Sequence, residues 1–151
     1  MKRIARMLIA GMAVSSLLAG CASGVKHADM ASSLPTLKAN EGRIYFMRSA
    51  SIFGAAIQPD IRLNNDVVGE SKPGGFFFVD RAAGKYVASA ATETEKTLSF
   101  VLDAGETKYV RSSPSMGLMV GRVVLELETP EKAKEELSSL SYTGNQKPAV
   151  K

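Results

Sequence analysis

The chain has 151 residues, with 19 Lys and Arg against 15 Asp and Glu, one Cys, one His and no Trp. This length suits one domain with room for a tail. The single Cys excludes a disulfide within the chain, and the single His argues against a His-rich metal site or catalysis by several imidazoles. Three basic residues lie in residues 1–20, which leaves 16 basic residues against 15 acidic ones. No Lys or Arg cluster follows, so we expect no nucleic-acid partner.

The N-terminal segment has the pattern of a secretory signal. Lys2, Arg3 and Arg6 form a basic start, and Met7–Leu18 is a mostly apolar run. Such a run is too short to cross a hydrocarbon core comfortably, which takes about 20 residues. It suits the apolar region of a signal peptide. The sequence therefore predicts a signal peptide over residues 1–20.

The segment ends in Leu18, Ala19, Gly20 and Cys21. Together with the basic and apolar stretches that precede it, this ending resembles the lipobox of bacterial lipoproteins. The resemblance implies a diacylglyceryl group on the Cys21 sulfur, cleavage before Cys21 and acylation of the new amine, a stable membrane anchor. Ala22 rather than an Asp follows, which by resemblance to enterobacterial sorting favours the outer membrane, facing the periplasm. The alternatives are a plain signal peptide followed by a free Cys, or an uncleaved anchor helix.

Residues 21–41 predict an acylated Cys and a flexible tether. The segment is rich in Ala and Ser, contains Gly24 and Pro35, and shows no sustained period. His27 lies within it, and we assign this residue no role. The alternative is that residues 30–37 dock onto the domain as an edge strand or a helical turn.

The sequence pattern of residues 42–140 predicts a mainly β domain. Short alternating or β-branched segments are separated by turn signals at intervals of about ten residues, as in all-β sandwiches and barrels. Because the connections are short, we expect mostly antiparallel pairing. The prediction is an antiparallel β-sandwich of about seven to eight short strands, near residues 43–47, 59–63, 67–70, 76–79, 85–90, 96–102, 107–111 and 121–127.

One C-terminal helix is expected to complete the domain. Thr129 suits the N-cap and Pro130 suits the first helical position. Ala133, Leu137 and Leu140 then recur on one face, which would pack on a sheet. The remaining residues, 141–151, predict a disordered tail.

Three consecutive phenylalanines, Phe76–Phe78, cannot all enter one core because strand side chains alternate between faces. We expect Phe77 to face away from Phe76 and Phe78. The Phe77 ring would then lie under the apolar face of the C-terminal helix or at an interface.

Two resemblances concern the domain. The segment GRIYFMRSASIFGAAIQPDIRLNNDVVGE, with FFFVDRAAGKYVASA and MGLMVGRVVLELE, resembles a family of small bacterial lipoproteins known only as a domain of unknown function. That resemblance spans Gly42 to Leu140 and implies an envelope lipoprotein with no known activity. More loosely, the turns Ala83–Tyr86 and Ala104–Thr107 are similar to those of PEGA-type and transthyretin-like sandwich modules, which implies the fold alone.

The sequence offers little for catalysis. The only His lies in the tether, and Cys21 is committed to lipid, so neither a nucleophile–His–acid triad nor a zinc site is supported. Asp60 with Asp66, or Glu70 with Asp80, could meet as an acid and a base. Ordinary turn hydrogen bonding explains these acids better. We predict no catalytic residues, no metal and no cofactor.

Two loops stand out because they are apolar and uncharged, at residues 49–57 and 112–120. If exposed together, they could contact a partner or lipid. Arg48 and Arg111 precede the loops and could orient an anionic group. The alternative, which the sequence favours, is that the loops are buried strand extensions or a bulged edge packed on the core. The contact candidates are Arg48, Ile52, Phe53, Arg111, Met116 and Met119.

The leading functional hypothesis is a non-enzymatic module, anchored by lipid on Cys21, that binds another envelope component through loops or a sheet edge. A second hypothesis is a periplasmic carrier or sensor for lipid, glycan or peptide, with Arg48, Arg62 or Arg111 in a cleft. A carboxylate-based hydrolase is the third and weakest.

Overall fold

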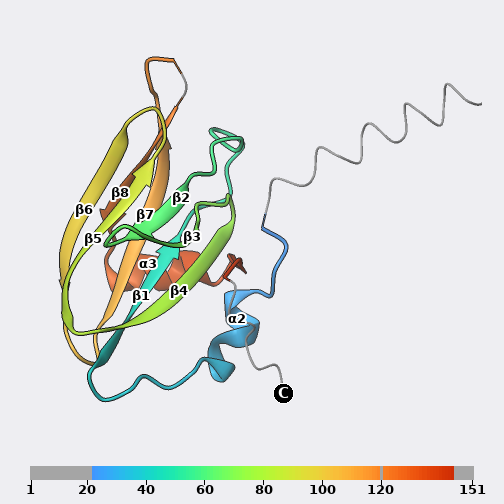
Figure 1. Cartoon of the computed structure of the whole chain (residues 1–151). Coiled ribbons are helices and arrows are strands. Elements are labelled where there is room, and N and C mark those ends of the chain that lie inside the picture. The colour runs from blue at the N-terminus through green and yellow to red at the C-terminus, as the bar shows by residue number, and fades with distance from the viewer. Residues whose placement is uncertain (1–21, 120, 145–151) are drawn as a thin grey trace, which may run out of the picture.

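The computed structural model describes residues 22–119 and 121–144 (Figure 1). The predicted signal peptide, Cys21 and residues 145–151 of the predicted tail lie outside the described residues. The elements, in chain order, are α2 (His27–Met30), the 3-10 turn η2 (Ala31–Ser33), β1 (Glu41–Met47), β2 (Asp60–Leu63), β3 (Asp66–Glu70), β4 (Gly75–Ala82), β5 (Gly84–Ala91), β6 (Glu95–Leu102), β7 (Thr107–Ser115), β8 (Arg122–Leu127), α3 (Pro130–Leu137) and β9 (Ser141–Tyr142).

The strands form two sheets that pack face to face, in the orders β8-β7-β1-β4-β9 and β3-β2-β5-β6 (Figure 1). This arrangement confirms the predicted β-sandwich with a C-terminal helix. Neighbouring strands are antiparallel except in the pairs β1–β7 and β4–β9, which are parallel. Parallel neighbours need a long connection. The pair β1–β7 has one, because the chain visits the second sheet between these strands.

The core between the sheets is built from alternate residues of each strand. Phe46 of β1 pairs with Phe77 of β4 on one side and Val110 of β7 on the other. The rings of Phe46 and Phe77 stack with centroids 5.0 Å apart. Ile61 of β2 and Leu102 of β6 belong to the same core and are fully buried. Burial of each such side chain contributes about 1.5–3 kcal/mol.

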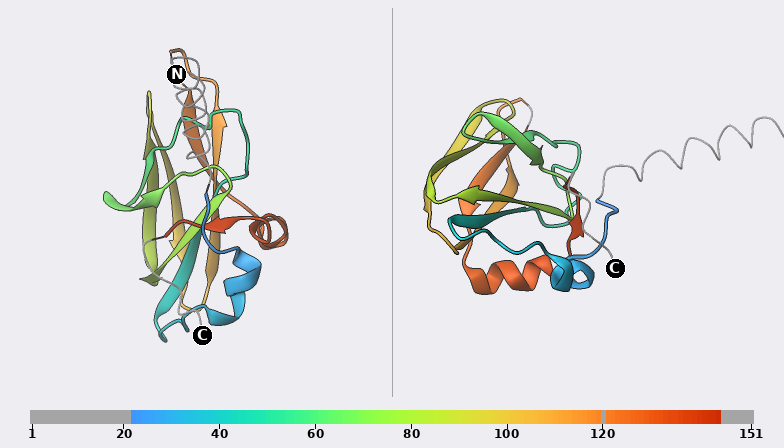
Figure 2. Two further views of the ribbon diagram at one scale, coloured as in Figure 1. Left: turned by 90° about the vertical axis from the view of Figure 1, so that its right-hand side faces the viewer. Right: turned by 60° about the horizontal axis from the view of Figure 1, so that its bottom comes forward.

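The opposite face of the five-stranded sheet lies under the helices (Figure 2). Phe76 and Phe78 are on this face, beside Tyr45 of β1. The His27 ring of α2 lies 5.2 Å from the Phe76 ring. The predicted alternation is therefore confirmed, but the predicted faces were exchanged: Phe77 enters the core between the sheets. Alternation along a strand separates two faces without saying which one meets the second sheet.

The helix α3 begins where the sequence predicted. Thr129 precedes it in extended conformation, Pro130 opens it, and the Thr129 carbonyl accepts the Ala133 N–H at 3.0 Å. Ala133, Leu137 and Leu140 are all buried, as the apolar stripe predicted.

The predicted start of the tail at residue 141 is wrong. Ser141 and Tyr142 form β9, pair with β4 and are both buried. The Tyr142 ring lies 5.5 Å from the Phe76 ring. Burial of this aromatic side chain outweighs the entropy that a free tail would keep.

The N-terminal segment is docked rather than free over its described residues. Met30 is 1% exposed, and the Val25 carbonyl accepts the Tyr142 N–H at 2.8 Å. This corrects the prediction of a flexible tether and agrees with the alternative of a docked helical turn. The helix begins at His27, three residues before the segment proposed in that alternative. Within the described ranges, no helix is long and apolar enough to cross a membrane.

Candidate functional site

The two uncharged loops lie at one end of the sandwich (Figure 1). On the β1–β2 loop, Ile52 is 96% exposed and Phe53 is 54% exposed. On the β7–β8 loop, Met116, Leu118 and Met119 are 74%, 92% and 90% exposed. We call these five side chains the apolar tip. The interpretation that the sequence favoured, buried strand extensions, holds for residues 112–115, which extend β7 and include the buried Ser112. It is wrong for the five residues of the apolar tip.

The bases of the two loops are packed together through glycines. Gly54 has φ +68°, and a Cβ on it would lie 2.5 Å from the Cβ of Pro114 on β7. A Cβ on Gly121 would overlap the side chain of Ile57. Both contacts therefore require the absence of a side chain. They hold the β1–β2 loop against the β7–β8 hairpin and bring the two halves of the apolar tip to the same end.

Arg48, directly after β1, holds the β1–β2 loop in place. Its side chain is 1% exposed. Nη1 donates to the carbonyl oxygens of Ile57 and Ser71 at 2.6 and 2.9 Å, and Nη2 donates to that of Gly54 at 2.7 Å. Burial lowers the pKa of Arg48. This geometry does not fit the predicted role of orienting an external anion, because the guanidinium is already occupied by backbone oxygens inside the domain.

Arg111 is also occupied. Its Nη2 lies 2.9 Å from Glu128 Oε2 and 2.5 Å from Glu136 Oε2. Glu136 belongs to α3, so the ion pair holds this helix against β7. Ser49, at the start of the β1–β2 loop, hydrogen-bonds to the same Glu136 carboxylate. Arg111 therefore supports the base of the apolar tip and is not free to bind an anion.

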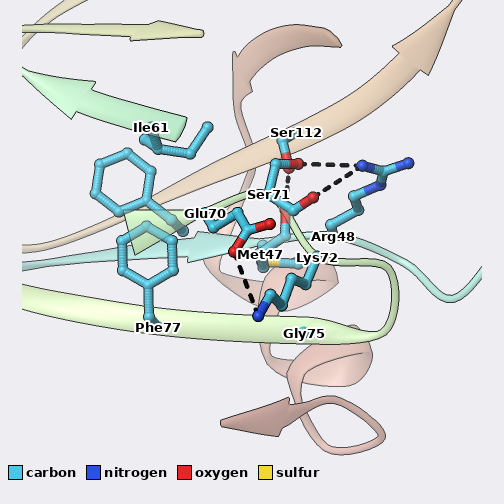
Figure 3. Close-up of a pocket in the computed structure, with 10 residues that line it drawn as sticks. Met47, Arg48, Ile61, Glu70, Ser71, Lys72, Gly75, Phe77 and Ser112 are labelled. Atoms are coloured by element: carbon cyan, nitrogen blue, oxygen red, sulfur yellow. Dashed lines mark hydrogen bonds and ion pairs between the residues drawn. The ribbon is translucent and has the colours of Figure 1, made fainter. Parts of the chain in front are cut away.

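The cavity beside Arg48 is too small for an organic ligand (Figure 3). Its volume is about 10 Å³, about what one water needs, whereas small-molecule sites usually exceed about 300 Å³. The Ser71 and Ser112 hydroxyls face each other there at 2.8 Å. The lining residues are Phe46, Met47, Arg48, Ile61, Glu70, Ser71, Lys72, Gly75, Phe77 and Ser112.

The third arginine of the carrier hypothesis lies elsewhere. Arg62 donates to the Asn65 carbonyl at 2.9 Å, in the β2–β3 turn. Its neighbours Ile61 and Leu63 are buried, whereas Arg62 is on the other face of the strand. Arg48, Arg62 and Arg111 therefore do not converge on one cleft.

The two carboxylate pairs are not brought together as an acid and a base. Asp60 and Asp66 lie at opposite ends of the β2–β3 hairpin, because Asp60 pairs with Glu70 and Asp66 with Leu63. Glu70 makes an ion pair with Lys72. Glu70 lies on β3 in the four-stranded sheet, whereas Asp80 lies on β4 in the five-stranded sheet. Asp80 accepts two hydrogen bonds from Arg43, at 2.7 and 2.8 Å. In the part of the chain that the structure describes, no group of three acidic, His or Cys side chains could hold a metal ion.

Residues 38–123 match the family described as "Protein of unknown function (DUF2846)", and the chain belongs to this family. The matched range contains both loops and all strands from β1 to β7. An uncharacterized protein of Haemophilus influenzae is 28% identical over 142 residues, which cover 91% of this chain and 83% of that protein. No solved structure matches the chain.

The sequence missed two parts of the site. Leu118 was not among the contact candidates, although it lies in the same uncharged run as Met116 and Met119 and its exposure could have been inferred with theirs. The second part is the docking of Ala22, whose N–H donates to the Pro73 carbonyl at 3.1 Å. No local pattern predicts that contact, since it joins residues 51 positions apart in the chain.

Proposed function

We propose that the protein is a lipid-anchored, non-catalytic module of the bacterial envelope, whose apolar tip binds another envelope component. The observation that carries the proposal is the exposure of five large apolar side chains on two loops packed at one end of the sandwich. Large apolar side chains gathered on a surface are typical of contact sites. Methionines within such a surface adapt readily to different partners.

The anchor rests on the sequence. The segment ending in Leu18, Ala19, Gly20 and Cys21 resembles a lipobox, and the proposed modification joins a lipid to the Cys21 sulfur. An anchor confines the domain to a membrane surface and raises its effective concentration for any component there. We propose the outer membrane, on its periplasmic side, as the location.

The carrier hypothesis has less support. The pocket beside Arg48, of about 10 Å³, holds no more than about one water. Two larger open hollows, of about 410 and 340 Å³, contain none of the three candidate arginines, which are already hydrogen-bonded or ion-paired. The hydrolase hypothesis also has less support, because its candidate carboxylates do not converge.

Photo-crosslinking in intact cells tests the proposal. Photoreactive residues replace Phe53 and Met116 on the apolar tip, and a matched control replaces Val101, which is 50% exposed on β6. We expect adducts with a lipid or one envelope protein at both tip positions and none at Val101. Equal labelling at all three positions would contradict a role for the apolar tip. In parallel, Cys21→Ser should release the protein from the membrane fraction, and retention of that variant would contradict the anchor.

A further inference from the structure

The described chain begins beside the base of the β1–β2 loop, one of the two loops that carry the apolar tip. The Ala22 N–H donates to the carbonyl of Pro73 in the β3–β4 turn at 3.1 Å. On the other side of that turn, a Cβ on Gly74 would lie 3.4 Å from the Cβ of Ala50, in the β1–β2 loop. The Arg48 N–H also donates to the Gly75 carbonyl at 3.0 Å. Ala22 and the base of the β1–β2 loop therefore flank one turn.

Cys21 is the residue that directly precedes Ala22, and successive Cα atoms are about 3.8 Å apart across a trans peptide bond. A lipid on Cys21 would therefore be attached close to the β3–β4 turn. The docked start of the chain leaves no long tether between the lipid and the domain. The acyl chains would then leave the protein on the side of the domain where the β1–β2 loop begins.

The chemistry of the two loops suits a bilayer surface. No charged residue occurs from Ser49 to Pro59 or from Ser112 to Gly121. A charge buried in hydrocarbon is costly, whereas Ile, Leu, Phe and Met side chains are favoured there. Glu93, from the β5–β6 turn, accepts a hydrogen bond from the Met119 N–H at 3.1 Å, which places one carboxylate beside the second loop. The exposed apolar side chains themselves carry no charge.

We propose that the occupant of the apolar tip is the lipid leaflet that holds the acyl chains of Cys21. The side chains of the apolar tip enter the boundary between headgroups and acyl chains, so the sandwich contacts the membrane with this end. This inference rests on the proposed lipidation of Cys21. It adds a fixed orientation: the opposite end, where Gly84 pairs with Leu102, points away from the membrane.

The absence of Trp from the chain allows a direct test. Phe53→Trp, Met119→Trp and the control Val101→Trp each introduce one fluorescent reporter at an exposed apolar position. The full-length mature protein, purified with its lipid, is reconstituted into phosphatidylethanolamine–phosphatidylglycerol vesicles, with and without bromine on the acyl chains. Bromine quenches Trp only at close range.

We expect blue-shifted emission and quenching of about two-fold for Phe53→Trp and Met119→Trp, since interfacial side chains reach about 5–10 Å into the headgroup and acyl boundary. Val101→Trp should show neither effect. Lipidated protein whose tip reporters are quenched no more than the Val101→Trp control overturns the inference. A blue shift in cell membranes without quenching in vesicles also overturns it and assigns the tip to a protein partner, which leaves the proposed function standing.

The mass of the purified protein distinguishes failure of the proposed lipid anchor from failure of the proposed membrane contact. Protein that carries no lipid on Cys21 overturns the anchor and, with it, this inference. The Trp variants are suited to the test because all three positions are at least half exposed, so the added ring meets solvent or lipid rather than the core.

Discussion

Nη2 of Arg48 donates a hydrogen bond to the carbonyl oxygen of Gly54 at 2.7 Å, so a fully buried cation at the end of β1 holds the loop that carries Ile52 and Phe53. The same guanidinium reaches Ser71, at the start of the β3–β4 turn beside which Ala22 docks. One side chain therefore organises the β1–β2 loop and the turn next to the start of the described chain.

Arg48→Met should destabilise the protein strongly. The substitution keeps a similar apolar stem but leaves the carbonyl oxygens of Gly54, Ile57 and Ser71 without this donor. Hydrogen bonds to charged groups contribute about 1.5–3 kcal/mol, and an unsatisfied buried acceptor adds to the loss, so we expect the free energy of unfolding to fall by about 2–4 kcal/mol.

Urea unfolding measures this change, with Arg62→Met as the matched control. Arg62 makes one exposed hydrogen bond, to the Asn65 carbonyl, and its replacement should change the free energy of unfolding by less than about 0.5 kcal/mol. Similar losses in both variants would show that Arg48 has no special structural role.

Gly69→Ala should disturb the core between the sheets. A Cβ on Gly69 of β3 would lie 2.5–2.7 Å from ring atoms of Phe77, which is itself stacked on Phe46. The ring must shift, and overpacking of this kind costs about 1–3 kcal/mol. Thermal unfolding should show a clear fall in Tm.

Gly84→Ala provides the comparison for Gly69→Ala. Gly84 also lies in a strand, but the nearest atom to its added Cβ is Cε2 of Tyr86 at 3.9 Å, an ordinary contact. The Tm of this variant should stay unchanged or rise slightly, because Ala restricts the unfolded chain. A Tm that falls equally in both variants would contradict the proposed clash with Phe77.

Much of the fold could be predicted because local patterns and burial agree. The alternating strands give the two sheets their inner faces, and Pro130 fixes the backbone at the first helical position, so the helix start could be predicted although the Thr129 side chain makes no capping hydrogen bond. The parallel pairing of β1 with β7 could not be read in the same way, because it depends on how the chain crosses between sheets.

The candidate site was only partly predictable for a related reason. Composition singled out the two uncharged loops and named Ile52, Phe53, Met116 and Met119. Their exposure depends on where β1 and β7 end, and a run of small apolar residues is also compatible with a buried strand. Arg48 was misread because a buried arginine bonded to backbone carbonyls leaves no local signature.

Arg111 and Glu136 should be energetically coupled. They join β7 to α3 with an Nη2–Oε2 distance of 2.5 Å, and their side chains are 27% and 15% exposed. Because the pair is partly screened by solvent, we expect a coupling free energy of about 1 kcal/mol in a double-mutant cycle of Arg111→Met and Glu136→Gln. Urea unfolding of the two single variants and the double variant measures it.

Glu126 gives an internal reference for this cycle. It lies directly opposite Arg111 in the β7–β8 register and is exposed. The cycle of Arg111→Met with Glu126→Gln should give a smaller coupling than the cycle with Glu136→Gln, because Glu126 is an exposed cross-strand neighbour that makes no ion pair with Arg111 in this structure. If Glu126 couples to Arg111 as strongly as Glu136 does, the helix-anchoring role of the ion pair is wrong.

Acid should loosen the N-terminal segment through His27. Its ring contacts Phe76 and Tyr45 edge-on, with centroids 5.2 and 5.8 Å apart. Burial lowers the pKa of His27 below its ordinary value of 6.5. The unfolded chain therefore binds this proton more readily than the folded protein. The stability that depends on a neutral His27 is complete above pH 6.5 and is lost as the pH falls through the lowered pKa.

His27→Phe isolates this contribution. Phe keeps an aromatic ring against Phe76 and Tyr45 but cannot be protonated, so the loss of stability below pH 6.5 should be smaller in the variant than in the wild type. Urea unfolding at several pH values measures the difference between the two proteins, which removes the titration of the carboxylates common to both. The protection factor of the Met30 amide, its exchange rate relative to the intrinsic rate at the same pH, should fall in acid in the wild type only, because α2 detaches when His27 gains its charge. Parallel stability curves for the two proteins would show that His27 does not control the docking of α2.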